Sequence, residues 1–230
     1  EVSKVDYIQV KTMYNPISNL TYQYNKDSKD LKLTWNRPLM LPIYTEGFEN
    51  NGTMPADITQ IDEDNDTKKW LITSAYKNTG KYSALSYSWA PAGPYNVSNW
   101  LITSKINKGA ESLKFWVKHD WKEQYDVYLV SAPTSGQIPT LDEIKAGSKV
   151  YDYTGATVNK VFKEITVDIS QKTANDFYLA FHHKSTVADD GFLLAIDDIS
   201  VGYDNSNVKE NSISKVVLSE EKVNILEGYK

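Results

Sequence analysis

The chain has no cysteine in its 230 residues. Disulfide bonds, thiolate metal ligands and a cysteine nucleophile are therefore excluded. No run of apolar residues is long enough to cross a bilayer, so membrane insertion is not expected. The first residues lack the basic and apolar regions of a signal peptide, which predicts that an exported protein with this sequence is a mature or excised fragment.

Positive charge is scarce as well. The chain has 25 Lys and Arg against 30 Asp and Glu, a formal net charge of -5. Proteins that bind nucleic acids neutralise phosphates with a basic surface, and no stretch here is rich in Lys or Arg, so no nucleic-acid partner is expected. Aromatic residues are abundant instead: the 16 Tyr and 6 Trp favour strands and recognition surfaces.

Helical periodicity is almost missing. The exception is Pro139–Ala146, where Thr140 is placed to cap the N-terminus, Glu143 follows three residues later, and Gly147 ends the helix. Elsewhere, short segments alternate apolar and polar residues between clusters of Gly, Pro, Asn and Ser. The clearest are Ser112–Lys118, Tyr125–Val130, Phe162–Asp168 and Phe177–His182. This pattern predicts an all-β chain folded as an antiparallel sandwich.

Three regions differ in character. Residues 43–203 form one long run of strand-like segments, and we expect them to be the main domain. Residues 1–42 hold two further strand-like segments, Leu20–Tyr24 and Leu31–Trp35. Residues 204–230 begin with a polar stretch and continue into another apolar segment, so they are expected to add at least one strand.

Acidic signatures bracket the main domain. Glu49 follows Phe48 near its start, and Asp197 and Asp198 interrupt an apolar strand near its end. Carboxylates in an apolar strand are costly to desolvate unless a cation or hydrogen bonds compensate. If the first and last strands lie side by side, these carboxylates meet in a hard-oxygen site suited to calcium.

Strand alternation places the side chains of Asp197 and Asp198 on opposite faces, so one of the two is expected to bind the ion. The alternative is that the carboxylates cap loops at a sheet edge.

A second acidic group lies at Asp62, Asp64 and Asp66. Acids at alternate positions are typical of the start of a calcium loop, in which the chain curls and the carboxylates converge. Such loops favour Gly after the third acid, where this chain has Thr67. A solvated acidic loop without an ion is the equal alternative.

Aromatic residues cluster between the two acidic signatures. Tyr87, Trp89 and Tyr95 surround a segment too rich in Pro and Gly for a core strand, so Trp89 and Tyr95 are expected on a loop, where rigid aromatics anchor partners. The alternative is that Trp89 folds back over the end of the sandwich. Trp100, inside an apolar run, is expected in the core.

Catalytic motifs are sparse. The three histidines are His119, His182 and His183, and the last two should point to opposite faces of one strand. Neither a Gly-x-Ser-x-Gly elbow nor a His-Glu-x-x-His motif is present. The chain is therefore predicted not to be an enzyme, with a Ser/His/Asp site assembled from distant positions as the least favoured alternative.

Together these segments resemble one family, the cleaved-adhesin (haemagglutinin/adhesin) modules of gingipains and related Bacteroidetes surface proteins. The segments that carry the resemblance are Glu46–Asn50, Pro55–Ala56, Ile61–Asp66, Trp70, Ser98–Thr103, Tyr125–Val130, Thr166–Ser170, Tyr178–His182 and Ile196–Ile199. The resemblance covers residues 43–203. It implies a jelly-roll sandwich, bound calcium and secretion to the cell surface. Related jelly-roll binding modules use a segment like Gly80–Leu85 for carbonyl ligands, which is expected here as well. Thr67 departs from the family's usual Gly.

The flanks are similar to strands of a fibronectin type III module. Pro16–Leu20 and Leu31–Trp35 look like its first two strands, and residues 214–230 like a later one. Two arrangements are equally compatible with the sequence. In one, an adhesin domain is inserted into, or flanked by, an incomplete Ig-like unit; in the other, linker strands dock on the main domain.

The family resemblance implies a function. We expect a calcium-stabilised adhesin module, secreted or associated with the outer membrane, whose loops 86–97 and 119–124 bind host extracellular proteins or glycans. Other domains of the same precursor are further candidate partners. The alternatives are a carbohydrate-binding module and a non-catalytic domain of a larger surface protease.

Overall fold

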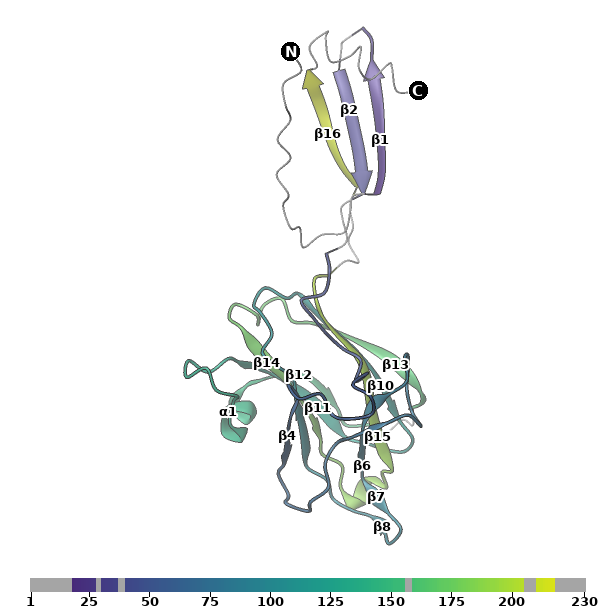
Figure 1. The fold of residues 1–230 in the computed structure, drawn as a ribbon, viewed down its shortest axis with the longest axis vertical. Coiled ribbons are helices and arrows are strands. Elements are labelled where there is room, and N and C mark those ends of the chain that lie inside the picture. Colours follow the sequence, from purple (N-terminus) through teal and green to yellow (C-terminus); the bar gives the residue numbers. More distant parts are fainter. Residues whose placement is uncertain (1–17, 28–29, 37–39, 156–158, 205–209, 218–230) are drawn as a thin grey trace. The chain divides into compact units, whose positions relative to one another are not determined.

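The computed structural model describes residues 18–27, 30–36, 40–155, 159–204 and 210–217. All strand pairs formed by these residues are antiparallel. The chain divides into two compact units, one of residues 42–203 and one of residues 1–41 together with 204–230. Each has sheets of its own (Figure 1).

The larger unit contains two main sheets. The strands of the first are β3 (Tyr44–Glu46), β5 (Leu71–Thr73), β6 (Ser83–Tyr87), β10 (Ser112–His119), β13 (Asn159–Asp168) and β15 (Leu193–Gly202). Its order is β13-β10-β15-β6-β5, and β3 also pairs with β15. The first and last strands of this unit are therefore neighbours, as the acidic bracket requires.

The second sheet has five strands. They are β4 (Thr59–Asp62), β9 (Asn99–Ile102), β11 (Tyr125–Ser131), β12 (Ser148–Tyr153) and β14 (Phe177–His183). Their order is β12-β11-β14-β9-β4. A two-stranded ribbon, β7 (Trp89–Ala90) with β8 (Gly93–Pro94), extends from the end of β6.

The core lies between the two sheets. Along β10, Leu113, Phe115 and Val117 are buried while the residues between them are more exposed, so one face of the strand points inward. Phe115 meets Phe181 of the opposite sheet edge to face, with ring centroids 5.3 Å apart. This packing confirms the predicted antiparallel sandwich; the jelly-roll assignment stays a prediction.

A short helix covers part of the outer face of the five-stranded sheet. It is α1 (Leu141–Ala146), and its Ile144 packs with Trp100 and neighbouring apolar residues. Thr140 and Glu143 form the predicted capping box. A Cβ on Gly147 would lie 2.9 Å from the carbonyl oxygen of Leu129, so the chain can leave the helix this close to β11 only at a glycine.

The smaller unit is a three-stranded sheet. It consists of β1 (Ser18–Asn25), β2 (Asp30–Asn36) and β16 (Glu210–Val217), with β2 in the middle. Segments from the two ends of the chain thus pair with each other. The fibronectin type III resemblance of these strands stays a prediction, and the part of it that falls on residues 16–17 and 218–230 lies outside the described residues.

No helix in the part of the chain that the structure describes is long and apolar enough to cross a membrane. One further short turn of helix, η1 (Val187–Asp189), lies between β14 and β15.

Phe115 gives a direct test of the core. Truncation of this fully buried ring in Phe115→Ala should lower the free energy of unfolding by about 3–5 kcal/mol, because it leaves a cavity where the two sheets meet. Urea denaturation measures the change. Val161→Ala, at a side chain that is 67% exposed, is the control and should change stability by less than about 0.5 kcal/mol. Similar losses for both variants would contradict this assignment of the core.

Candidate metal and ligand-binding sites

A bulge in β15 sets the direction of its two acidic side chains. Trp116 of β10 pairs with Asp197, whereas Lys114 pairs with Ser200, so β15 has one extra residue between these pairs. Asp198 lies in the bulge with a φ of 47°. The prediction that Asp197 and Asp198 point to opposite faces is therefore wrong, because it assumed regular alternation.

Both carboxylates face the segment Asn78–Tyr82. Asp197 Oδ2 accepts a hydrogen bond from the Asn78 backbone amide at 2.7 Å, and Asp198 Oδ2 accepts one from the Asn78 side chain at 2.7 Å. The Thr79 hydroxyl donates to Asp198 Oδ1, also at 2.7 Å. Burial, with the charge of Asp198 adding to it, raises the pKa of Asp197 to about 6.

Glu49 reaches the same segment from the start of the domain. Its Oε1 accepts hydrogen bonds from the amides of Lys81 and Tyr82, at 2.9 and 3.1 Å. A Cβ on Gly80 would lie 2.2 Å from this oxygen, and Gly80 has a φ of +59°. Only glycine therefore fits where the carboxylate rests on the backbone.

The three bracket residues thus gather around one loop. A Cβ built on Gly47 would lie 3.6 Å from Asp198 Oδ1 and 3.9 Å from Glu49 Cγ, so both side chains approach this glycine. Carboxylate oxygens such as those of the buried Asp197 and its neighbour Asp198 suit a hard divalent cation such as calcium. Among the described residues, however, the bracket carboxylates do not form a group whose ligand atoms all lie within 4.8 Å of one another; they meet on the loop rather than at one point. Glu49, Asp197 and Asp198 are the residues that would hold it.

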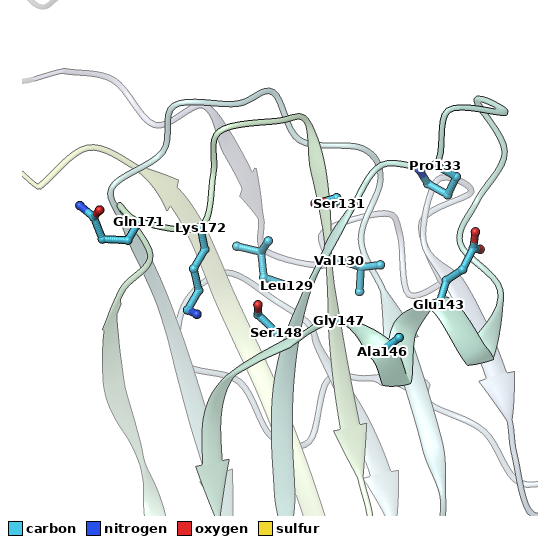
Figure 2. Close-up of a pocket in the computed structure, with 10 residues that line it drawn as sticks. All are labelled: Leu129, Val130, Ser131, Pro133, Glu143, Ala146, Gly147, Ser148, Gln171 and Lys172. Carbon is cyan, nitrogen blue, oxygen red and sulfur yellow. The ribbon is translucent and has the colours of Figure 1, made fainter.

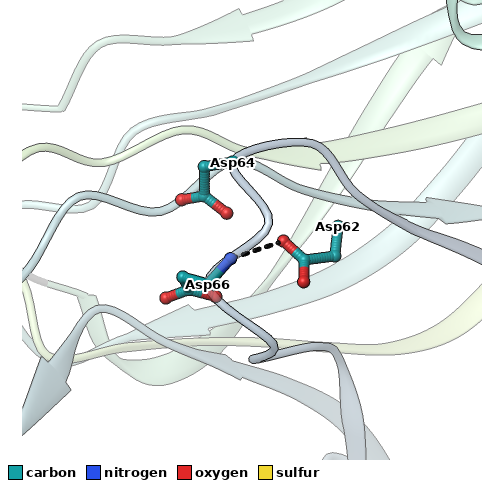
Figure 3. A group of neighbouring side chains, drawn as sticks. All are labelled: Asp62, Asp64 and Asp66. Atoms are coloured by element: carbon teal, nitrogen blue, oxygen red, sulfur yellow. Dashed lines mark hydrogen bonds between the residues drawn. The ribbon is translucent and has the colours of Figure 1, made fainter.

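The second predicted acidic group also converges. Within the described part of the chain, Asp62, Asp64 and Asp66 form a group whose ligand atoms all lie within 4.8 Å of one another (Figure 3). The turn is held by Asp62, which accepts from the amides of Asp66 at 3.2 Å and Thr67 at 2.9 Å. Thr67 has a φ of +69°, so it adopts a left-handed backbone conformation that favours glycine.

The charges of this group repel one another. Burial and the neighbouring Asp62 and Asp66 raise the pKa of Asp64. Burial opposes ionisation of Asp62 as well, but hydrogen bonds from Asp64 and from backbone amides lower its pKa. Lys68 offsets part of the charge, because its Nζ lies 2.6 Å from Asp66 Oδ2. The oxygens suit calcium, and Lys68 already supplies one positive charge there.

The predicted aromatic residues separate into different roles. Trp89 is exposed on the β7–β8 ribbon, with 40% of its surface accessible. Tyr95 is half-buried: its hydroxyl donates to the Tyr87 carbonyl at 2.8 Å, and Lys68 Nζ lies 3.8 Å from its ring centroid. Tyr87 is half-buried too, with its ring edge-on to Phe192. Trp89 is therefore the one of the three most available to a partner.

Trp89 lines a pocket with residues that are distant in sequence. Its volume is about 330 Å³, and the lining residues are Trp89, Trp121, Asp190, Gly191 and Phe192. Trp121, 51% exposed, lies within the predicted loop 119–124. Residues 190–192 escaped the sequence analysis, because a short Asp-Gly-Phe run between two strands has the composition of an ordinary turn.

A buried carboxylate fixes the walls of this aromatic pocket. Glu123 is fully buried and accepts hydrogen bonds from the Ser88 hydroxyl, the Phe192 amide and the Ser185 hydroxyl. His183 Nε2 lies 2.8 Å from the same carboxylate. Burial alone would raise its pKa, but the hydrogen bonds from His183, Ser185 and Ser88 outweigh it and lower the pKa of Glu123 to about 2. Nothing in the sequence around Glu123 distinguishes it from a surface loop residue.

A larger cavity of about 470 Å³ lies beside α1 (Figure 2). Figure 2 shows Lys172 on one side of it and Glu143 on the other, with the ends of β11 and β12 between them. Glu143 is engaged in the capping box of α1. The charged groups of this cavity therefore lie on opposite sides and do not converge on one point.

One Ser/His/Asp arrangement is present on the outer face of the five-stranded sheet. Ser98 Oγ lies 2.9 Å from His182 Nε2, and His182 Nδ1 lies 3.2 Å from Asp126 Oδ1. The Ser98 hydroxyl, however, donates to Glu63 Oε2 at 2.9 Å. The His182 ring is stacked on Trp100, and Lys184 Nζ lies 2.7 Å from Asp126. These contacts describe a polar network over the sheet in which the serine is not held for nucleophilic attack.

Comparison with known proteins agrees with this architecture. The sequence model of the cleaved adhesin domain matches residues 42–201. The chain belongs to the cleaved adhesin domain family. The matched residues coincide closely with the larger compact unit of the structure.

Relatives of this cleaved adhesin domain are much longer proteins. Hemagglutinin A of Porphyromonas gingivalis is 27% identical over 217 residues, which are 84% of this chain and 8% of that protein. Lys-gingipain W83 of the same organism is 28% identical over 223 residues, 88% of this chain and 12% of that protein. The chain therefore spans only a small part of the curated relatives it matches.

Solved structures show the same fold. The K1 cleaved adhesin domain of Lys-gingipain from Porphyromonas gingivalis W83 superposes with a TM-score of 0.57 at 22% identity, covering 70% of this chain and 98% of that one. The K2 domain of Lys-gingipain gives a TM-score of 0.55 at 26% identity, covering 69% of this chain and 96% of that one.

Glu123 predicts a specific acid sensitivity. A folded-state pKa of about 2, below the ordinary value of 4.5, stabilises the fold above pH 4.5, and this contribution is lost as the pH falls from 4.5 towards 2. The contribution is on the order of 3 kcal/mol. Glu123→Gln should lower stability at pH 7 and flatten the stability curve between pH 4.5 and 2, measured by urea denaturation at each pH.

Glu164→Gln provides the control, because Glu164 is exposed on β13. It should leave the acid limb of the curve unchanged. An acid limb in Glu123→Gln as steep as in the parent protein would show that Glu123 does not carry this pH dependence.

Proposed function

We propose that this chain is a calcium-stabilised adhesin module of a secreted or cell-surface protein, and that it binds host extracellular proteins or glycans without catalysing a reaction. The observation that carries the proposal is the convergence of Glu49, Asp197 and Asp198 on the segment Asn78–Tyr82. Membership of the cleaved adhesin domain family supports the adhesive role.

The bracket residues explain what calcium would do for stability. They come from the start of the domain and from β15, which lie far apart in the sequence and contact one loop. Burial of Asp197, with the charge of Asp198 beside it, raises the pKa of Asp197 and so opposes keeping this carboxylate ionised in the folded state. A bound divalent cation supplies the missing positive charge and favours the folded state over the unfolded state. The Asp62, Asp64 and Asp66 group is the second proposed calcium site.

The aromatic pocket is the proposed contact surface. Trp89 on the β7–β8 ribbon and Trp121 on the loop after β10 are large exposed aromatics, and such residues are common anchors at interfaces. The sandwich and the Glu123 network hold both loops in place. A carbohydrate-binding module is the second candidate function, favoured by the same two exposed indoles, because sugars also stack on aromatic platforms.

Removal of calcium should lower the melting temperature. A ligand at about 100 times its dissociation constant adds about 2.7 kcal/mol, which corresponds to roughly 5–10 °C for a domain of this size. Calorimetry with excess calcium and with EDTA measures the shift, and elemental analysis of the purified chain identifies the ion.

Single variants separate the two proposed sites. Glu49→Gln should reduce the calcium-dependent shift through the bracket, and Asp64→Asn should reduce it through the acidic loop. Glu164→Gln, which removes one exposed charge elsewhere, should keep the full shift. Identical melting curves with and without calcium in the parent chain would overturn the calcium part of the proposal.

The pocket tryptophans should be needed for adhesion but not for folding. Trp89→Ala and Trp121→Ala should each weaken binding to host matrix proteins or glycans about tenfold or more, as truncated interface anchors do. Surface plasmon resonance against an immobilised panel measures binding, and calorimetry checks folding. Ile138→Ala, matched in exposure at 51%, is the control. Unchanged binding by both tryptophan variants would place the contact surface elsewhere.

A further inference from the structure

The aromatic pocket is lined mainly by aromatic rings, and its charge is negative. Trp89, Trp121 and Phe192 supply aromatic rings, Gly191 supplies backbone, and Asp190 is the one residue of the lining with a charged side chain. Asp190 has a φ of 52°, so the chain turns sharply just before the glycine. The site therefore offers aromatic faces and a single carboxylate.

A second carboxylate lies directly behind the glycine. A Cβ built on Gly191 would lie 2.6 and 2.8 Å from the two oxygens of Glu123. Any side chain larger than a hydrogen atom would therefore collide with the buried carboxylate. Glu123 remains ionised at neutral pH. His183 Nε2 lies 2.8 Å from this carboxylate, and Lys122 is an exposed basic residue of the same loop. Asp189 and Asp190 add two further acids beside them.

One anchor holds all the pocket walls. Glu123 binds Ser88, which precedes Trp89, and the amide of Phe192, which follows Gly191. It also lies two residues after Trp121 in the same loop. The walls are therefore positioned before a ligand arrives, which lowers the entropy cost of binding.

We propose that this pocket receives a cationic side chain, lysine or arginine, from a segment of the host protein to which the module adheres. The inference rests on the proposed adhesive function. A cation over aromatic faces is attracted by their quadrupoles, and an arginine also stacks on them through its planar guanidinium. Asp190 supplies the opposite charge at the rim. A sugar ring also stacks on indoles, but it carries no charge for Asp190 to attract, so the charge of the probe separates the two kinds of ligand.

The experiment uses the full chain in calcium-containing buffer, with its tryptophans labelled with ¹⁵N. The probes are the Nα-acetyl methylamides of arginine, lysine and citrulline; citrulline has nearly the shape of arginine without the charge. Chemical shifts of the six indole N–H groups report where each probe binds, and Trp89→Phe and Trp121→Phe assign two of them. Methyl glycosides of common hexoses form the fourth arm.

Arginine and lysine probes should shift the Trp89 and Trp121 resonances in a saturable way, and citrulline should bind at least about fivefold more weakly. Asp190→Asn should weaken the arginine probe about 3–10-fold, since asparagine tolerates the left-handed backbone of this position and removes only the charge. Glu164→Gln, with the same loss of charge on β13, should bind as the parent chain does.

Three results would overturn the inference. Equal affinities of citrulline and arginine would show that charge does not contribute to binding in the pocket. Glycosides that move both indoles while the cations do not would make it a sugar site. An absence of shifts with every probe would reject the pocket as a ligand site. These three results test the pocket and not the adhesive function. If Trp121→Ala still binds the host protein, the adhesive function stands although the inference about the pocket fails.

Discussion

Compensation of negative charge at the bracket is the constraint on which the rest of the main domain depends. Asp197 and Asp198 lie in the middle of β15, a central strand of the larger sheet, and Glu49 comes from the other end of the domain. The segment Asn78–Tyr82 partly satisfies all three with backbone and side-chain donors. These residues flank the pairing of β3 with β15. The charge balance of this site therefore affects how the first and last strands of the domain stay together.

The aromatic pocket is built on a different principle. There the negative charge is fully buried at Glu123, and hydroxyls, an amide and His183 satisfy it. Hydrogen bonds of this kind to an ionised group are strong, and they tie together loops that share no strand pairing.

These two sites suggest how the module divides its work. The acidic bracket and the Asp62–Asp66 loop act on the stability of the sandwich, in our proposal through calcium. In the same proposal, the pocket at Trp89 and Trp121 serves recognition of the partner. Glu123 contributes to both stability and the binding surface. It is buried like a core residue, and its hydrogen bonds position the residues that line the pocket.

The sequence by itself determined the strand-rich class, the capped helix at Leu141–Ala146 and the acidic residues that would gather, because alternation, capping chemistry and charge in an apolar strand are local signals. Only the tertiary structure decided the direction of Asp198, since a bulge depends on pairing with β10. It also decided the half-buried position of Tyr95 and the role of Glu123, because the contacts that define both come from residues distant in the chain.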